Sequence, residues 1–166
     1  MKPLFLAGGL TLNFILQFFF LQSWQTSGLG LNLVLAYIVI VSLYATKEEM
    51  LWLALFAGLF GDLYSSSDFG LYLGFYLLTA IIAKYFLRVG DIDCSAWKPI
   101  VFLAFLSLVQ GAIVCIPVYG SAPLQAVTTA LASYVSLTVA AGVLWYLLLG
   151  HLGNFLSSIK ATKILR

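Results

Sequence analysis

The chain alternates long apolar runs with short polar breaks. Six of these runs are close to the length that an α-helix needs to cross the hydrocarbon core of a membrane, which is about 20 residues. They cover residues 4–22, 29–45, 47–64, 69–87, 98–118 and 124–149. Because the breaks are too short to hold a further domain, we predict a single six-helix transmembrane domain over residues 1–166.

Composition agrees with this pattern. Hydrophobic residues make up 63% of the chain, charged residues make up 8%, and the mean hydropathy is +1.07. These values lie far outside the range of soluble domains, so we predict an all-α integral membrane protein.

The positions of the basic residues predict an orientation. Cytoplasmic loops near helix ends collect lysine and arginine. With both termini in the cytoplasm, all eight basic residues fall on the cytoplasmic side, and the three outer loops contain none; the eight are Lys2, Lys47, Lys84, Arg88, Lys98, Lys160, Lys163 and Arg166. We therefore expect a multi-pass protein of the bacterial cytoplasmic membrane. The net charge of +2 gives no support for nucleic-acid binding and indicates contact with anionic inner-leaflet lipid.

A stripe of small residues marks the third apolar run. Ala54, Ala57, Gly58 and Gly61 recur at intervals of three and four, which places them on one helix face, and Asp62 extends that face. Small residues let helices approach closely in lipid, so such stripes mark packing surfaces. A similar pair, Gly70 and Gly74, opens the fourth run, and the last run has two small faces, one over Ala126, Ala130 and Tyr134 and one over Ala132, Ser136 and Ala140. Each surface could pack inside the protein or against a partner.

Asp62 is an acid in an apolar run, and such residues are costly in lipid. Three roles are open to it. It could accept hydrogen bonds from the free amides that begin the next helix, with Asp68 nearby; it could help to position a partner; or it could relay protons or ions, which would require further ionisable groups at the same depth. Ser67 or Asp68 could also cap that next helix.

Other polar residues predict helix boundaries and contacts. Thr46 and Glu49 have the spacing of a capping box, so a helix should begin at Lys47. Asn13, Gln17 and Gln110 lie inside apolar runs, where polar side chains most often form hydrogen bonds between helices.

Residues for catalysis or metal binding are scarce. His151 is the only histidine, and no Cys, His and Asp residues have the spacing of a metal site. We also find no serine with a base nearby and no glycine-rich phosphate loop. Cys94 and Cys115 are expected on opposite sides of the membrane, too far apart to pair. We therefore expect a protein that is not an enzyme and has no cofactor.

The segment from the second to the fourth run resembles the rod shape-determining protein MreD family. Members tend to carry a Pro-Asp pair that opens an apolar helix, then a Gly-Leu-x-x-Asp-Leu segment, a short Ser/Gly turn and a Gly-Leu pair that opens the next helix. Here Gly58-Leu-Phe-Gly-Asp62-Leu, the serines after Tyr64 and Gly70-Leu71 match in order and spacing. Asn32 replaces the acid of the pair, and Phe69 replaces a usual proline.

The resemblance implies a scaffold of the bacterial cell-elongation machinery that does no chemistry itself. Such a scaffold would bind the single-span protein MreC and, through it, MreB filaments, the glycosyltransferase RodA and its transpeptidase partner. The family is similar in fold to the substrate-binding subunits of energy-coupling-factor transporters. A vitamin-capturing subunit is therefore the alternative, which Ala7, Gly8, Gln22, Trp24 and Gln25 leave open. A channel is disfavoured, because no helix carries a row of polar residues.

Overall fold

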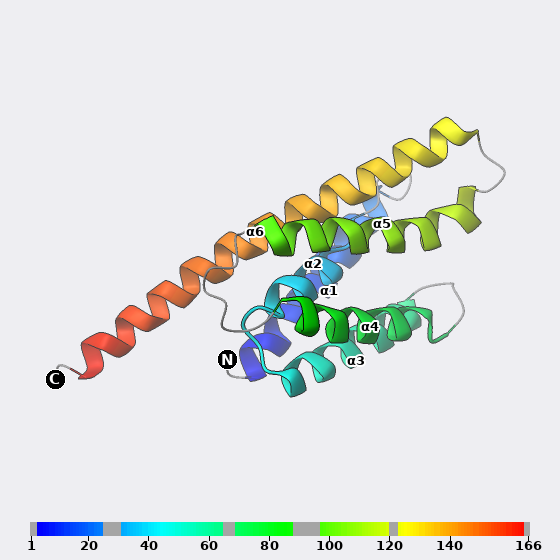
Figure 1. Ribbon diagram of the computed structural model, residues 1–166. Coiled ribbons are helices and arrows are strands. Elements are labelled where there is room, and N and C mark those ends of the chain that lie inside the picture. The colour runs from blue at the N-terminus through cyan, green and yellow to red at the C-terminus, as the bar shows by residue number, and fades with distance from the viewer. Residues whose placement is uncertain (1–2, 25–30, 65–68, 88–96, 120–122, 165–166) are drawn as a thin grey trace.

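The computed structural model describes residues 3–24, 31–64, 69–87, 97–119 and 123–164. These residues form six α-helices and no strands, as the pattern predicts (Figure 1). The helices are α1 (Pro3–Trp24), α2 (Leu33–Val41), α3 (Lys47–Tyr64), α4 (Leu71–Phe86), α5 (Trp97–Tyr119) and α6 (Leu124–Ile164). Helix α3 packs mainly against α4, and α5 packs mainly against α6. In space, α1 and α2 lie between these two pairs (Figure 1).

Helix α2 is the centre of the bundle. Each residue from Val34 to Val41 is at most 1% exposed, and the helix contacts all five others. Leucine, valine, isoleucine and alanine surround its axis, which is the pattern of a helix buried on every side.

The length of α2 corrects our prediction of a helix over residues 29–45. It has nine residues, which is about 14 Å at 1.5 Å per residue. At its start, the Asn32 side chain caps the helix. At its end, the amides of Leu43 and Tyr44 bond to carbonyls only three residues earlier, so the chain tightens into turns before α3 begins.

The predicted capping box is present at the start of α3. The Thr46 amide donates to Glu49 Oε2 at 2.8 Å, and the Glu49 amide donates to Thr46 Oγ1 at 3.3 Å. Two free donors are thus satisfied reciprocally, and α3 begins at Lys47 as predicted.

Helix α6 is longer than predicted. We expected it to end at residue 149, but it continues to Ile164 and extends well past the other helices (Figure 1). Gly150 does not end it, because a glycine inside a helix costs only about 1 kcal/mol and no proline follows. Among the described residues, only the part of α6 from Leu124 to His151 is both long enough and apolar enough to cross a membrane by itself. Shorter apolar helices are Phe5–Phe19, Leu71–Phe86 and Trp97–Ile113.

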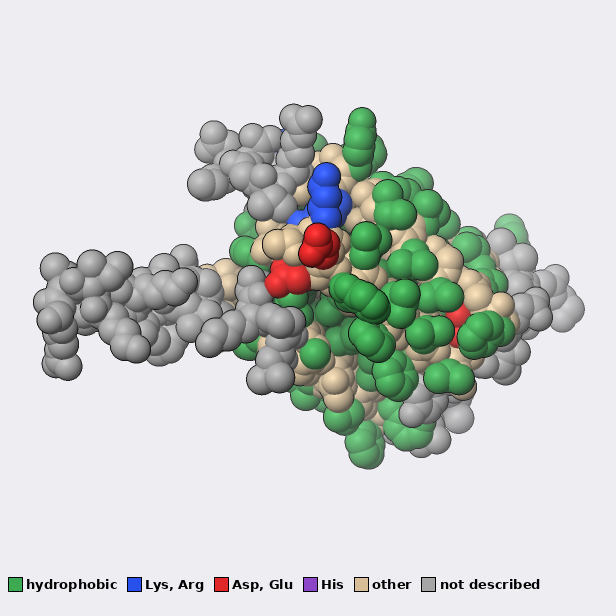
Figure 2. Space-filling view, turned by 90° about the horizontal axis from the view of Figure 1, so that it is seen from below, with side chains coloured by type: hydrophobic (Ala, Val, Ile, Leu, Met, Phe, Trp, Pro, Cys, Tyr) green, Lys and Arg blue, Asp and Glu red, His purple; other side chains and the backbone are tan. Residues whose placement is uncertain are grey.

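Hydrophobic side chains fill the core and also cover much of the described surface. Large hydrophobic side chains cover much of the outside, and several are at least 70% exposed, including Phe19, Leu63, Tyr85, Phe86 and Leu124. In Figure 2 hydrophobic side chains dominate the face, and most of the charged ones gather in one region. Eight polar side chains lie buried among the hydrophobic ones; they are Asn13, Asn32, Ser42, Asp62, Thr79, Ser107, Gln110 and Thr138.

Candidate functional site

The predicted small-residue stripe on α3 packs against α4. A Cβ atom added to Gly58 would lie 2.3 Å from the Cα atom of Leu73, so the two backbones are in contact there. One added to Gly61 would lie 3.0 Å from the Cβ of Tyr72. Ala54 and Ala57 are fully buried. We call Ala54, Ala57, Gly58 and Gly61 the α3–α4 seam, and it is an internal contact of this protein.

Asp62 lies at the end of the α3–α4 seam and holds the start of α4. Its carboxylate accepts from the Gly70 amide at 2.9 Å, the Tyr72 amide at 2.8 Å and the Leu73 amide at 3.2 Å. The side chain is only 5% exposed. The first amides of a helix have no partner within the helix, and the positive end of the helix dipole favours an anion. The predicted role as an acceptor for these amides is therefore confirmed.

The start of α4 differs in detail from our prediction. The N-cap residue is Gly70, which makes no side-chain cap, and Asp62 of α3 accepts from the Gly70 amide. Gly70 has a φ of 102°, a left-handed conformation that suits glycine. Ser67 and Asp68 lie outside the described residues.

Gly74 does not form a packing pair inside the protein. It is exposed, and a Cβ atom added to it would meet nothing within 4 Å. The small surface at Gly74 therefore faces outward, away from the α3–α4 seam.

A second polar site surrounds the start of α2. We call it the Asn32 cluster, and it contains Asn32, Tyr76, Gln110, Tyr134 and Thr138 from α4, α5, α6 and the cap of α2. All five residues are at most 7% exposed. The cluster joins four of the six helices of the described structure at one buried point.

The bonds of the Asn32 cluster are specific. The Asn32 Oδ1 atom caps α2 by accepting from the Leu35 amide at 2.8 Å. Its Nδ2 atom lies 2.8 Å from Gln110 Oε1, 2.9 Å from the Tyr76 hydroxyl and 3.2 Å from the Tyr134 hydroxyl. The Asn32 amide donates to Thr138 Oγ1 at 3.1 Å. The free amides of a buried helix start thus find partners on neighbouring helices.

Helix α1 contributes to the same end of α2. Gln17 Oε1 accepts from the Val34 amide at 3.3 Å. One turn earlier on α1, Asn13 Oδ1 accepts from Trp145 Nε1 of α6 at 3.0 Å. The prediction that Asn13, Gln17 and Gln110 make hydrogen bonds to other helices is confirmed.

Sequence reasoning missed the central role of Asn32 and the partners Tyr76, Tyr134 and Thr138. Tyrosine and threonine inside apolar runs are read as part of the apolar pattern, so they give little signal. A possible signal was Asn32 itself, because asparagine directly before an apolar run is a common N-cap.

The other end of α2 is also held by a neighbour. Lys84 of α4 donates from Nζ to the Ser42 carbonyl at 2.7 Å and to the Ala45 carbonyl. A cation at a helix C-terminus bonds to free carbonyls and interacts favourably with the helix dipole. Both ends of α2 are therefore fixed by side chains from elsewhere in the bundle.

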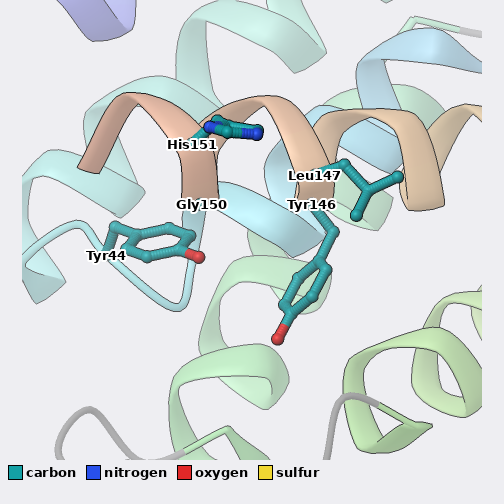
Figure 3. Close-up of a pocket in the computed structure, with 5 residues that line it drawn as sticks. All are labelled: Tyr44, Tyr146, Leu147, Gly150 and His151. Atoms are coloured by element: carbon teal, nitrogen blue, oxygen red, sulfur yellow. The ribbon is translucent and has the colours of Figure 1, made fainter. Parts of the chain in front are cut away.

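A surface hollow of about 230 Å³ lies beside α6, lined by Tyr44, Tyr146, Leu147, Gly150 and His151. In Figure 3 the Tyr146 and Tyr44 rings lie below the α6 ribbon, whereas the His151 ring lies against the ribbon itself. The polar atoms do not converge on one point. No group of three His, Cys, Asp or Glu residues in the described part of the chain could hold a metal ion.

Comparisons with protein families, with curated proteins and with solved structures find no match to this chain. The Asn32 cluster and the α3–α4 seam with its Asp62 cap are therefore the features on which a functional proposal rests.

Proposed function

We propose that this protein is a six-span membrane protein with both termini in the cytoplasm. Its exposed apolar side chains support this, because water solvates an apolar surface poorly and lipid solvates it well. Its buried polar groups support it as well, because backbone amides and polar side chains within a membrane need partners inside the protein. Short helices such as α2 are compatible with lipid when neighbouring helices surround them.

We further propose that the protein is a scaffold of the bacterial cell-elongation machinery that binds an MreC-like single-span protein. The observation that carries this proposal is the Asn32 cluster. A transporter subunit that captures a vitamin needs polar groups that face a cavity. Here Asn32 bonds with its neighbours on α4, α5 and α6, which ties the helices together and favours a rigid body for assembly.

One exposed surface suits a partner helix. Ala132, Ser136 and Ala140 lie on one face of α6, and all three are exposed. The Ser136 hydroxyl bonds to the Ser133 carbonyl of its own helix at 3.1 Å, so the face is small and its serine is satisfied. Small residues at intervals of four let a second helix approach closely in lipid. We assign this face to the transmembrane helix of the MreC-like protein.

The proposed orientation predicts the result of reporter fusions. Fusions after Trp24, Ser66 and Gly120 should report a position outside the cytoplasm, because no basic residue lies in those loops. Fusions after Thr46, Asp93 and Lys163 should report a cytoplasmic position. Alkaline phosphatase and fluorescent-protein reporters measure the two outcomes. A cytoplasmic signal after Ser66 would contradict the six-span arrangement.

The proposed function predicts capture of a partner. The wild-type chain, purified in mild detergent from cells that also express the MreC-like protein of the same bacterium, should retain that protein. Ser136→Leu places a large side chain on the exposed face of α6 and should weaken capture about tenfold, which corresponds to about 1.4 kcal/mol. Quantitative immunoblotting of the eluate measures both results.

The matched control for this experiment is Thr11→Leu. Thr11 is an exposed hydroxyl residue of α1, and its side chain bonds within its own helix, as that of Ser136 does. Thr11→Leu should leave capture of the MreC-like protein unchanged. An equal loss of capture in Ser136→Leu and Thr11→Leu would contradict the assignment of the α6 face to the partner helix. Recovery of a vitamin in stoichiometric amount with the wild-type chain, without the MreC-like protein, would contradict the scaffold and favour the transporter subunit.

A further inference from the structure

The paired helices α3 and α4 are short for a lipid-facing part of a membrane protein. On α3, Tyr64 at the helix end lies fifteen residues after Glu49, which is about 23 Å at 1.5 Å per residue. On α4, Lys84 lies thirteen residues after Leu71, which is about 20 Å. The hydrocarbon core of a typical bilayer is about 30 Å thick. The two helices therefore fall short of it by a similar length.

Polar groups close both ends of this helix pair. In the sequence, residues 65–68 between the two helices are three serines and an aspartate. At the cytoplasmic end, Glu49 closes the capping box of α3, and Lys84 Nζ donates to the carbonyls of Ser42 and Ala45. Because both charged side chains are engaged with nearby backbone, they do not make up the missing length by extending toward the headgroups.

The outer faces of α3 and α4 are open to lipid. Trp52, Phe56 and Leu63 of α3 are exposed, and so are Leu78 and Ile81 of α4. This differs from α2, which is shorter still but is buried on every side by other helices. Lipid chains must therefore adapt to the length of α3 and α4 directly.

The opposite side of the bundle suits a bilayer of ordinary thickness. On α5, Tyr119 lies 21 residues after Lys98 with no charged residue between them, which is about 32 Å. On α6, the 28 residues of Leu124–His151 cover about 42 Å. In Figure 1 the pair of α5 and α6 and the pair of α3 and α4 lie on opposite sides of α1 and α2. The apolar height of the protein thus differs between its two sides.

We propose that the outer face of α3 and α4 binds a locally thinned bilayer, with a hydrocarbon thickness of about 20–23 Å instead of about 30 Å. A long helix can tilt to fit the bilayer, but tilting lowers the height of a short helix further, so a single chain is accommodated by thinning of the lipid. This face therefore fits lipids with short acyl chains. The inference rests on the proposed six-span arrangement and is independent of the proposed partner.

The test measures the depth of nitroxide labels in a bilayer. The full-length chain carries Cys94→Ser and Cys115→Ser and is placed in nanodiscs of phosphatidylcholine with 18-carbon chains. One variant is labelled at Leu63→Cys of α3, and its matched variant is labelled at Ile113→Cys of α5. Both positions are exposed, and they lie fourteen and fifteen residues after the last cytoplasmic charge of their helix.

Collision rates with oxygen and with a water-soluble nickel complex give the depth of each label. In a bilayer of uniform thickness, both labels would lie about 8 Å below the outer headgroups. We expect the Ile113 label at that depth. Thinning should bring the Leu63 label to the level of the headgroups, which makes it about 8 Å shallower than the Ile113 label.

Trp52→Cys and Val101→Cys provide the matched control at the cytoplasmic end. Each position is exposed and lies three residues after the same charge of its helix. Their labels should have equal, shallow depths. A deeper label at Trp52 would show that α3 and α4 are displaced toward the outer surface as a unit, which would overturn the proposal.

The remaining outcomes separate the thinned bilayer from the six-span arrangement. Equal depths for the Leu63 and Ile113 labels would overturn the thinning and leave the six-span arrangement intact. Low collision rates with both oxygen and nickel at Leu63 would show that a second copy of the chain covers the face, which would overturn the assignment to lipid. Water-like collision rates at all four sites would contradict the six-span arrangement itself.

Discussion

Gly58→Leu should prevent the protein from reaching its folded state in useful yield. The first side-chain atom would lie 2.3 Å from the Cα atom of Leu73, and a backbone atom cannot move aside as the end of a side chain can. Helices α3 and α4 would have to separate along several turns, which also weakens the bonds between Asp62 and the amides of α4. Overpacking of a core costs about 1–3 kcal/mol and sometimes more, and we expect a loss at or above the top of that range. Thermal unfolding in detergent and the yield of monodisperse protein measure it.

The matched control is Gly74→Leu, the same substitution on the other helix of the pair. Gly74 is exposed and has open space around its Cα atom, so the variant should fold with nearly wild-type stability. Leu59→Ala, next to Gly58 in the chain, removes a partly exposed side chain and should also be mild. Similar yields and unfolding temperatures for Gly58→Leu and Gly74→Leu would show that the α3–α4 seam is not a close contact.

The sequence was most informative where function and packing depend on local spacing. The start of α3 followed from Thr46 and Glu49, whose bonds are three residues apart. The α3–α4 seam followed from the spacing of small residues, and the partners of Asp62 followed from the free amides that any helix start exposes. These features involve one helix or two consecutive helices joined by a short connection, so few arrangements of the chain compete with the observed one.

The sequence was least informative where distant segments meet. Residues 32 and 138 bond across 106 positions of the chain, and nothing near either position identifies the other. The boundaries of α2 were also missed, although Asn32 has the side chain of a common N-cap. Apolar residues flank its helical part, so hydropathy does not mark the boundaries, and the partners of Asn32 on α4 and α5 are distant in sequence.

Outward and inward small surfaces could not be separated from the sequence either. Gly58 and Gly74 each stand four or fewer residues from another glycine, but Gly58 meets α4 whereas a Cβ atom added to Gly74 would meet no atom within 4 Å. In lipid, the exposed surface and the packed interior are both apolar, so hydrophobicity does not distinguish them as it does in water. The packing of the whole bundle decides which small residues remain available to a partner.

Asn32→Leu should destabilise the protein by about 3 kcal/mol or more, because several buried groups lose their partner at once and each costs about 1–3 kcal/mol. The Leu35 amide would lose its cap, and Gln110 Oε1 and the Tyr76 hydroxyl would lose bonds to Asn32. The unfolding midpoint in a mixed-micelle denaturation measures the change. Asn13→Leu provides the control. Within the described structure it removes one hydrogen bond to another helix, the bond that Asn13 accepts from Trp145. Its loss of stability should be clearly smaller than that of Asn32→Leu.

Asn32→Asp should be milder than Asn32→Leu, although it places a carboxylate in the core. One new oxygen can still accept from the Leu35 amide, and the Gln110 amide can turn over and donate its Nε2 protons to the other. The Tyr76 and Tyr134 hydroxyls can also donate to it, so the cluster supplies four donors to one acid. We expect an unfolding midpoint between those of the wild type and Asn32→Leu, and equal losses in the two variants would contradict the assignment of Asn32 as the hydrogen-bonding centre of the bundle.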